Sequence, residues 1–385
     1  MTGTADGFDA VMAAVDPERL TALLVDSVEQ YSPSYAEEPA MEVFIAALAE
    51  TGLPHLRQPV PGREAGDNLG NLIVEWGPQP PAFCWVGHVD TVPAMGDQEP
   101  LPRREGDILH GLGTADMKSG CAAIVEALTA LRSAGVEPKR GLAVALVVGE
   151  EEYGDGSAAL LQRVAAPLTV IGEPTGLVPC IDHYAYQEYR LHTGGARVHA
   201  ALPELGANAI HAMLTWLTAL YEAAQDPRYA GRLALNPRDI RGGGDMFVVA
   251  EQCEAAIDIH VRPDVAADEV LAVIEAARDR AAANHPDCRL WYERQYVADG
   301  YAIAPMDARL GPLSRAFDRT GEPWAPAAFR SHSDGSMFHA KGVAPVICGP
   351  GRLEVAHTRH ECVSIAETER AARLYAAMIY EACMV

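Results

Sequence analysis

The chain is poor in basic residues and has neither a long apolar run nor a secretory leader pattern. It contains 30 Lys and Arg against 53 Asp and Glu, and its formal net charge is −23 at pH 7. Phosphate groups would be repelled by this charge, so we expect neither nucleic acid nor a membrane surface as a partner. No apolar run approaches the roughly 20 residues of a membrane-spanning helix, and the acidic first residues lack the basic-then-apolar order of a signal peptide.

Paired cysteines are also missing. The eight cysteines are scattered along the chain, and none forms a Cys-x-x-Cys pair. Several lie within apolar runs, where a free cysteine behaves as a small hydrophobic residue. A disulfide framework is therefore not expected, and the sequence predicts a protein of the reducing cytoplasm.

The first and last parts of the chain alternate apolar strands with amphipathic helices. Hydrophobic residues make up 49% of the 385 positions, which is enough for the cores of two domains or of one domain with an insertion. The patterns predict strands at 71–76, 82–86, 142–148, 168–171 and 344–348, and helices at 118–133 and 365–383. This alternation is typical of an α/β fold, with a mostly parallel sheet and helices on both faces.

The middle of the chain has a different pattern. It predicts a strand after Tyr184, a helix at 207–224, strands around Phe247 and at 255–261, a helix at 266–283 and a strand at 290–292. This order indicates a small α+β unit with its own sheet. We therefore expect one domain formed by 1–182 and 297–385, interrupted by a second domain at 183–296.

His88 and Asp90 follow an apolar strand, and positions two apart on extended backbone face the same way. His88 can therefore ligate a metal while Asp90 hydrogen-bonds its other ring nitrogen. The alternative is a structural histidine paired with a loop aspartate. Asp116 precedes a helix and can bridge two ions with its two oxygens, or serve only as an N-cap.

Three consecutive glutamates, at positions 150–152, follow the apolar strand 142–148. Their charges repel unless a metal ion or a proton compensates them, although a surface turn is the alternative. Glu173 ends another short strand, and His357 follows the Gly349-Pro350-Gly351 turn. Since the ends of parallel strands meet at one edge of a sheet, these side chains predict a site for zinc, manganese or cobalt.

The chain resembles the zinc aminoacylase/carboxypeptidase family, which includes acetylornithine deacetylase, succinyl-diaminopimelate desuccinylase, acetyl-lysine deacetylase and bacterial glutamate carboxypeptidase. The matching stretches, in family order, are GHVDTVP (87–93), GLGTADMKSG (111–120), GEEEYGDGS (149–157), IGEPT (171–175), VHAALPELGANAI (198–210), SDG (333–335) and GPG followed by AHTRHECV (349–363).

The resemblance implies two divalent metal ions, of which zinc is expected and cobalt or manganese is possible. Asp116 would bridge them. One ion would also take His88 and Glu173, and the other Glu152 and His357.

The resemblance also implies a general base, the first glutamate of an adjacent pair. The residues that follow fit Glu151 as the base and Glu152 as the ligand, while a pair of Glu150 and Glu151 is the other possible register. Asp90 would orient His88.

The inserted domain would be the family's lid and dimerisation domain, so the resemblance implies a homodimer. His199 matches the lid histidine that reaches the partner subunit's active site and stabilises the developing oxyanion. Asn208 lies in the matching turn and would contact substrate.

Several substrate-recognition positions depart from the family pattern. Where Asp-x-Arg is usual on the lid, the chain has His260, and Arg262 two positions along is a possible substitute. His332 stands before Ser-Asp in place of a small residue. We expect His260, Arg262, Arg330 and His332 to contact the substrate.

The leading hypothesis is a dinuclear metal hydrolase that cleaves the amide bond of an N-acyl amino acid or a related small carboxylate. A dipeptidase or carboxypeptidase comes second. A family member repurposed for ligand binding or for a non-hydrolytic reaction of specialised metabolism is the third reading.

Overall fold

The computed structural model describes residues 7–63, 70–96, 101–164, 166–244 and 246–385, and the chain divides into two compact units. Unit 1 comprises Met1–Ile181, Ile303–Phe329 and Ser333–Val385. Unit 2 comprises Asp182–Ala302 and Arg330–His332. Unit 2 covers the segment expected at 183–296, extends beyond it to Ala302 and also includes Arg330–His332.

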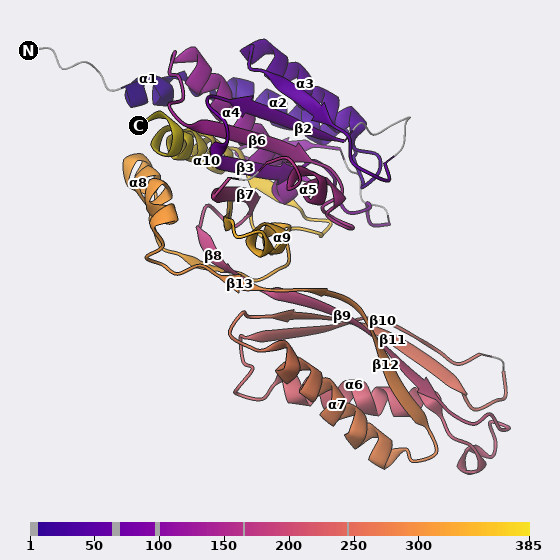
Figure 1. Cartoon of the computed structure of the whole chain (residues 1–385). Helices are drawn as coiled ribbons and strands as arrows, with labels where there is room; N and C mark the ends of the chain where they lie inside the picture. The colour runs from indigo at the N-terminus through magenta and orange to yellow at the C-terminus, as the bar shows by residue number, and fades with distance from the viewer. Residues whose placement is uncertain (1–6, 64–69, 97–100, 165, 245) are drawn as a thin grey trace, which may run out of the picture. The chain divides into compact units, whose positions relative to one another are not determined.

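Unit 1 is built on a large sheet whose central strands are parallel (Figure 1). Its strands include β1 (His55–Gln58), β2 (Asn71–Trp76), β3 (Pro81–His88), β6 (Gly141–Val147), β7 (Leu168–Pro174) and β15 (Ala344–Gly349). The order runs β1-β2-β6-β3-β7-β15 and continues to β8 (Cys180–His183) and β13 (Tyr301–Ala302), and β14 (Ala327–Phe329) pairs with β8 outside this path. β6, β3, β7 and β15 are parallel, whereas β1 and β2 are antiparallel to their neighbours. The predicted α/β class with a mostly parallel sheet is confirmed.

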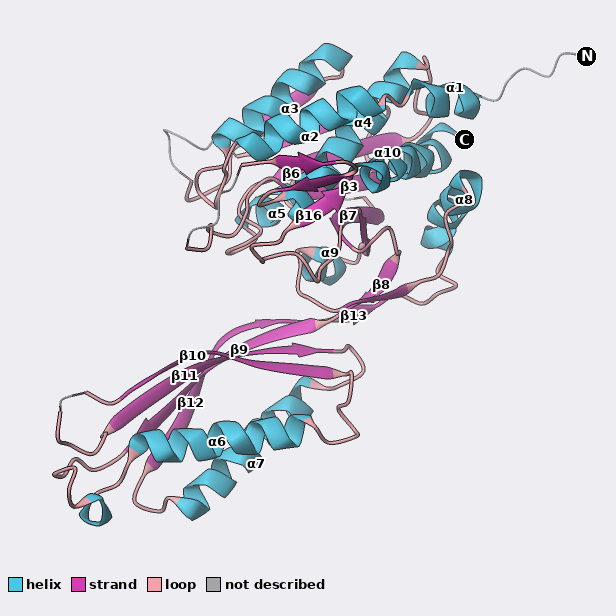
Figure 2. Cartoon of the chain, turned by 180° about the vertical axis from the view of Figure 1, so that it is seen from behind, coloured by secondary structure: helices cyan, strands magenta, loops and turns pink. Residues whose placement is uncertain are grey.

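Helices cover both faces of this sheet (Figure 2). They are α1 (Gly7–Ala14), α2 (Pro17–Glu29), α3 (Glu38–Thr51), α4 (Ser119–Ser133), α5 (Asp155–Leu160), α8 (Gly311–Thr320), α9 (Gly335–Ala340) and α10 (Ile365–Ile379). Every residue of β6 is buried, which explains its continuous apolar run, since a central parallel strand is covered on both faces. Among the described residues, no helix combines the length and the apolar character needed to cross a membrane.

A small antiparallel sheet lies beside the loop that contains Asp116. It consists of β4 (Arg103–Glu105), β5 (Ile108–His110) and β16 (Cys362–Ser364). Because β16 pairs with β5, the segment before β16 is held against the turn that follows β5, and the Gly111 N–H donates to the backbone carbonyl of Glu361 at 3.2 Å.

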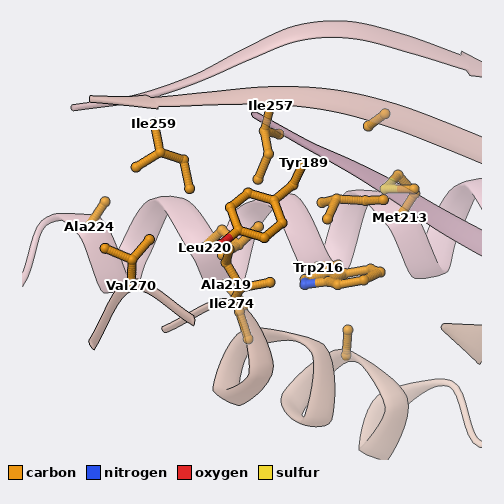
Figure 3. Packing of buried hydrophobic residues seen from close by; sticks show 14 of the residues in the cluster. Tyr189, Met213, Trp216, Ala219, Leu220, Ala224, Ile257, Ile259, Val270 and Ile274 are labelled. Carbon is orange, nitrogen blue, oxygen red and sulfur yellow. The ribbon is translucent and has the colours of Figure 1, made fainter. Parts of the chain in front are cut away.

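Unit 2 is a four-stranded antiparallel sheet with two helices on one face. Its strands, in spatial order, are β10 (Leu233–Gly242), β11 (Gln252–Val261), β9 (Ala185–Gly194) and β12 (Arg289–Ala298), and its helices are α6 (Ala209–Ala224) and α7 (Ala267–Asn284). Figure 3 shows the core between sheet and helices, where Tyr189 and Ile257 from the strands meet Trp216 and Ile274 from the helices.

The expected strand around Phe247 is wrong. Phe247 lies in a turn, has a positive φ of 64° and is 69% exposed. The strand that precedes β11 is instead β10, which carries Pro237 and several charged residues. β10 is an edge strand, where proline and charge are tolerated, so it lacks the apolar alternation that predicts strands.

Candidate metal centre

Four acidic and imidazole side chains lie at the carboxyl ends of three adjacent parallel strands. His88 is the last residue of β3, Glu173 lies at the end of β7, and Glu150 and Glu151 follow β6. Since β6, β3 and β7 are neighbours, these strand ends bring the side chains together at one edge of the sheet.

Asp116 lies between two histidines. Its Oδ1 is 3.1 Å from His88 Nε2, and its Oδ2 is 3.3 Å from His357 Nε2. The carboxylate thus directs one oxygen to each imidazole, which is the arrangement that a carboxylate bridging two ions requires.

The remaining carboxylates divide between the two histidines. Glu173 Oε1 lies 3.6 Å and Glu150 Oε2 3.9 Å from His88 Nε2, whereas Glu151 Oε2 lies 3.1 Å from His357 Nε2. Among the described residues, two groups have candidate ligand atoms within 4.8 Å of one another: His88 with Asp116 and Glu151, and His88 with Glu150 and Glu173.

Glu152 does not take part in this cluster. Its side chain is exposed and belongs to neither group of candidate ligands. The chain turns at Gly149, where φ is 71°, and Glu150 and Glu151 follow with their side chains toward the histidines. The geometry therefore differs by one residue from the expected assignment of Glu151 as base and Glu152 as ligand.

Asp90 orients this turn through its carboxylate. The N–H groups of Glu150 and Glu151 donate to its two oxygens at 3.2 and 3.1 Å, and the Ser34 hydroxyl donates at 2.8 Å. The His88 ring is held by the backbone carbonyl of Asp90, 2.9 Å from Nδ1, whereas the Asp90 carboxylate is 3.6 Å away. Burial alone would lower the pKa of His88, but the carboxylates of Glu173 and Asp116 raise it well above its ordinary value, so the imidazole would give up its Nε2 proton to ligate an ion while Nδ1 donates to the Asp90 carbonyl.

Replacing Asp90 by Asn is expected to lower kcat by about 10–100-fold, the usual cost of removing a partner that orients metal ligands. Asn offers one acceptor oxygen where the carboxylate accepts from two backbone N–H groups and Ser34, so the Glu150-Glu151 turn loses part of its support. Steady-state kinetics at saturating metal would measure the loss. Wild-type kcat in this variant would show that the turn does not depend on the carboxylate.

The buried carboxylates of the cluster favour a positive charge beside them. Burial, and then the charge of Asp334, raise the pKa of Glu150 well above its ordinary value. Burial and Asp116 do the same to the pKa of Glu173. Burial alone would lower the pKa of His357, but hydrogen bonds to Asp116 and Glu151 raise it to about 11.

The donor set fits divalent metal ions. Imidazole nitrogens and carboxylate oxygens are the ligands of zinc, and carboxylates also suit manganese. Glu173 Oε1 is buried and has no hydrogen-bond partner among the described residues, as expected of an atom whose partner is an ion. A cation would also compensate the crowding of carboxylates that raises their pKa values.

The gain in Tm on adding Zn²⁺ to the chelator-treated protein is expected to grow between pH 5 and pH 7. Without metal, the raised pKa values of Glu150 and Glu173 mean that the folded state binds more protons than the unfolded state, so its stability falls as pH rises above the ordinary glutamate value. The raised pKa of His357 acts in the same direction above its ordinary value of 6.5. Metal binding requires deprotonated ligands and removes this loss. Thermal unfolding measured with and without Zn²⁺ at several pH values tests this prediction. A gain in Tm that does not change with pH would contradict it.

Two buried residues that support the site escaped the sequence analysis. The Glu361 carboxylate accepts the N–H groups of Gly113, Ala115 and Asp116 at 3.0, 2.9 and 3.0 Å, and so holds the loop that carries Asp116. Buried Lys118 donates to the carbonyls of Ser27 and Gln30 at 2.9 and 2.7 Å. In the sequence, these supporting roles of Glu361 and Lys118 are indicated only by their nearness to His357 and Asp116. The backbone groups that they hydrogen-bond come close to them only in the folded chain.

The lid residues singled out from the sequence all lie in unit 2. His199 is exposed, and its Nδ1 accepts the N–H of Ala201 at 3.1 Å. Asn208 is the N-cap of α6 and accepts the N–H groups of Ile210 and His211 at 3.0 and 3.2 Å. Asn208 therefore has a structural role that explains its presence without a substrate contact.

The four expected substrate residues differ in their surroundings. His260 and His332 both lie beside the ring of Tyr186, with centroid distances of 5.1 and 5.9 Å. Arg262 forms an ion pair with Asp264 at 3.2 Å. Arg330 is exposed and forms no ion pair with any residue in the described part of the chain.

Comparisons with known proteins agree on one family. The model of Peptidase family M20/M25/M40 matches residues 84–381. The chain is 30% identical to a putative LysW-lysine/LysW-ornithine hydrolase of Pyrobaculum aerophilum, over 91% of this chain and 94% of that protein. It is 26% identical to the N-formyl-4-amino-5-aminomethyl-2-methylpyrimidine deformylase of Halalkalibacterium halodurans, over 77% of this chain and 78% of that protein. The crystal structure of aminopeptidase PepT from Bacillus cereus shares the fold, with a TM-score of 0.76 at 21% identity. The match covers 96% of this chain and 99% of that structure.

Proposed function

Because the chain belongs to Peptidase family M20/M25/M40, we propose that it is a metal-dependent amidohydrolase that cleaves the amide bond of an N-acyl amino acid or a related small substrate. The observation that carries the proposal is the placement of Asp116 between His88 and His357, 3.1 and 3.3 Å from their Nε2 atoms, with further carboxylates beside each histidine. Relatives named as a deformylase and as a LysW-lysine/LysW-ornithine hydrolase support the reaction class.

We propose two divalent ions, preferentially Zn²⁺, with Co²⁺ or Mn²⁺ as alternatives. Asp116 would bridge them. His88 and Glu173 would complete one site, and His357 and Glu151 the other. Bound at these positions, the ions would polarise the scissile carbonyl and lower the pKa of water.

Glu150 is the proposed general base. It receives a proton from the attacking water and delivers it to the nitrogen of the leaving amine, so that one carboxylate serves both proton transfers. Its position is set by Asp90, which accepts the Glu150 N–H at 3.2 Å, and by the Gly149 turn at the end of β6. Glu151 was the expected base, but its distance of 3.1 Å from His357 supports a ligand role.

His199 is the proposed donor to the developing oxyanion. Its Nδ1 accepts the backbone N–H of Ala201, so neutral His199 carries its proton on Nε2 and can donate from there. We propose that it serves the partner's active site in a homodimer formed through unit 2. Exposed apolar side chains of unit 2, including Leu205, Leu214 and Phe247, at 69%, 50% and 69% exposure, support an interface there.

Replacing His199 by Ala is expected to lower kcat by about 10²-fold with no change in metal content, because an oxyanion donor is lost. Mixing this variant with a Glu150→Gln variant tests whether His199 acts in the partner subunit. About half of the randomly mixed dimers would combine the two variants, and each would contain one intact site, restoring about one quarter of wild-type activity. Absence of any recovery in verified mixed dimers would place His199 in its own subunit's site.

We also propose a cytoplasmic location, because the eight cysteines are scattered along the sequence without a Cys-x-x-Cys pair, as is usual for proteins of a reducing compartment.

Elemental analysis combined with a substrate panel tests the overall proposal. We expect about two metal ions per chain and metal-dependent release of free amine from at least one N-acetyl, N-formyl or N-succinyl compound. A panel of dipeptides measured beside it separates a deacylase from a dipeptidase. Bound metal without hydrolysis of any amide would contradict the proposed reaction, and absence of metal binding after reconstitution would contradict the assigned ligands.

A further inference from the structure

Arg63 is a buried arginine of unit 1 that the proposed chemistry does not use. Its side chain is 1% exposed, although it belongs to a loop outside the helices and strands. The guanidinium donates from Nη1 to Glu37 Oε1 at 2.6 Å, and from Nε and Nη2 to the two oxygens of Asp155 at 2.6 and 3.0 Å. An arginine fork that meets two carboxylates in this way is fixed in both position and orientation.

The fork lies directly against the turn that leads into Glu150 and Glu151. A Cβ atom added at Gly149 would overlap with both Arg63 Nη2 and Asp155 Oδ1, so the backbone of the turn packs on the paired groups and leaves no room for a side chain. The φ of Gly149 is 71°, a left-handed value that glycine adopts most easily. Arg63 and its partner therefore form the surface on which this turn rests.

One short segment links Arg63 to Asp90, whose carboxylate accepts the backbone N–H groups of the same turn. The Ser34 hydroxyl donates to Asp90 Oδ2 at 2.8 Å. Glu37, three residues further along, accepts from Arg63. The Tyr35 ring covers the guanidinium, whose carbon lies 4.3 Å from the ring centroid. The turn is thus held by two linked anchors rather than by the Asp90 carboxylate alone.

Arg57, six residues earlier in the chain, provides a comparison for a purely structural arginine. It donates from Nη1 and Nη2 to the two oxygens of Glu38 at 3.0 and 2.8 Å, and from Nη2 to the Gly70 carbonyl at 3.0 Å. These partners, at the start of α3 and just before β2, lie outside the candidate metal centre. Arg63 forms a fork of the same kind, but its fork touches the backbone that immediately precedes Glu150.

We propose that Arg63 is a positioning residue of the hydrolase, which fixes the Gly149 turn and thereby the place of the Glu150 carboxylate, the proposed general base. It acts through the backbone of the turn. A displacement of about 1 Å at a catalytic group can cost about 10²-fold in rate, so a residue that acts only through a turn can have a large effect on kcat. The inference rests on the proposed function in taking Glu150 as the base, whereas the support that Arg63 gives the turn can be measured without a substrate.

Hydrogen–deuterium exchange of the full-length protein tests this support without turnover. Arg63→Lys keeps a positive charge beside buried Glu37 but loses the planar fork. We expect the backbone N–H groups of Glu150 and Glu151 to exchange about tenfold faster in this variant, as measured by mass spectrometry with fragmentation that resolves single residues. Arg57→Lys is the matched control, because it removes a similar fork and should leave exchange at this turn unchanged. Unchanged exchange in Arg63→Lys, or an equal increase in Arg57→Lys, would overturn the proposal.

Steady-state kinetics connects the turn to catalysis. For any amide that the wild type hydrolyses, we expect Arg63→Lys to lower kcat about tenfold with unchanged KM and metal content. Arg57→Lys should leave all three quantities unchanged. Asp155→Asn removes a charge from the other side of the fork and should act in the same direction as Arg63→Lys. The Asp155 side chain is 24% exposed, so this variant is less prone to disturb folding. Wild-type kcat in both Arg63→Lys and Asp155→Asn would overturn the proposal.

A double variant distinguishes positioning from a general effect on the fold. Added to Glu150→Gln, Arg63→Lys should lower kcat no further, because a residue that acts through the Glu150 carboxylate then has nothing left to position. Losses that multiply in the double variant would overturn the proposal. If the wild type hydrolyses no amide, the proposed function fails, while the exchange experiment still decides whether Arg63 holds the turn.

Discussion

Replacing Glu150 by Gln is expected to lower kcat by about 10²–10⁴-fold while the two proposed metal ions remain bound, because the variant keeps the shape of the side chain and loses the proton acceptor. Glu150 follows the buried strand β6, and its carboxylate lies 3.9 Å from His88 Nε2, at the edge of the cluster rather than between the histidines. Elemental analysis and steady-state kinetics on the same preparation measure both parts of the prediction.

The neighbouring glutamates supply matched controls. Glu152→Gln changes an exposed side chain outside the cluster and should leave kcat and metal content close to wild type. Glu151→Gln should instead lose metal, because Glu151 lies 3.1 Å from His357 Nε2. Full activity in the Glu150→Gln variant would support Glu151 as the general base. An inactive Glu151→Gln variant that keeps two metal ions would support the same assignment.

Replacing Asp116 by Ala is expected to remove bound metal and to lower kcat/KM by at least about 10³-fold. Metal ions contribute several kcal/mol of charge stabilisation in amide hydrolysis, and 1.36 kcal/mol corresponds to a factor of ten. Asp116 faces both His88 and His357, so its removal would affect both proposed sites at once.

The control for Asp116→Ala is Asp287→Ala, which removes an exposed carboxylate of unit 2. Its metal content and activity should match wild type. Loss of one ion but not the other in Asp116→Ala would show that the carboxylate serves a single site. Retention of both ions at normal affinity would contradict its bridging role.

Much of the candidate site could be predicted from the position of its residues at the ends of predicted strands. Apolar runs ending in His88 and Glu173 predicted strand ends, and parallel strands bring such ends to one edge. The structure brings these two residues together with Asp116 and His357.

Other features depended on contacts that no local pattern records. Three consecutive glutamates are equivalent in sequence, and only the Gly149 turn and the hydrogen bonds of Glu150 and Glu151 to Asp90 distinguish them. The expected role of Asp90 also changed, since its carboxylate lies nearer to this turn than to the His88 ring.

The sequence by itself determined the fold class, the family and the set of residues from which a metal site could be built, because hydrophobic periodicity and ordered motifs are local properties of the chain. The tertiary structure decided which glutamate faces which histidine, where β10 lies, and that His332 joins Tyr186 and His260 in unit 2. Those outcomes depend on turn geometry and on contacts between residues far apart in the chain, and such contacts form only when the strands and helices are packed together.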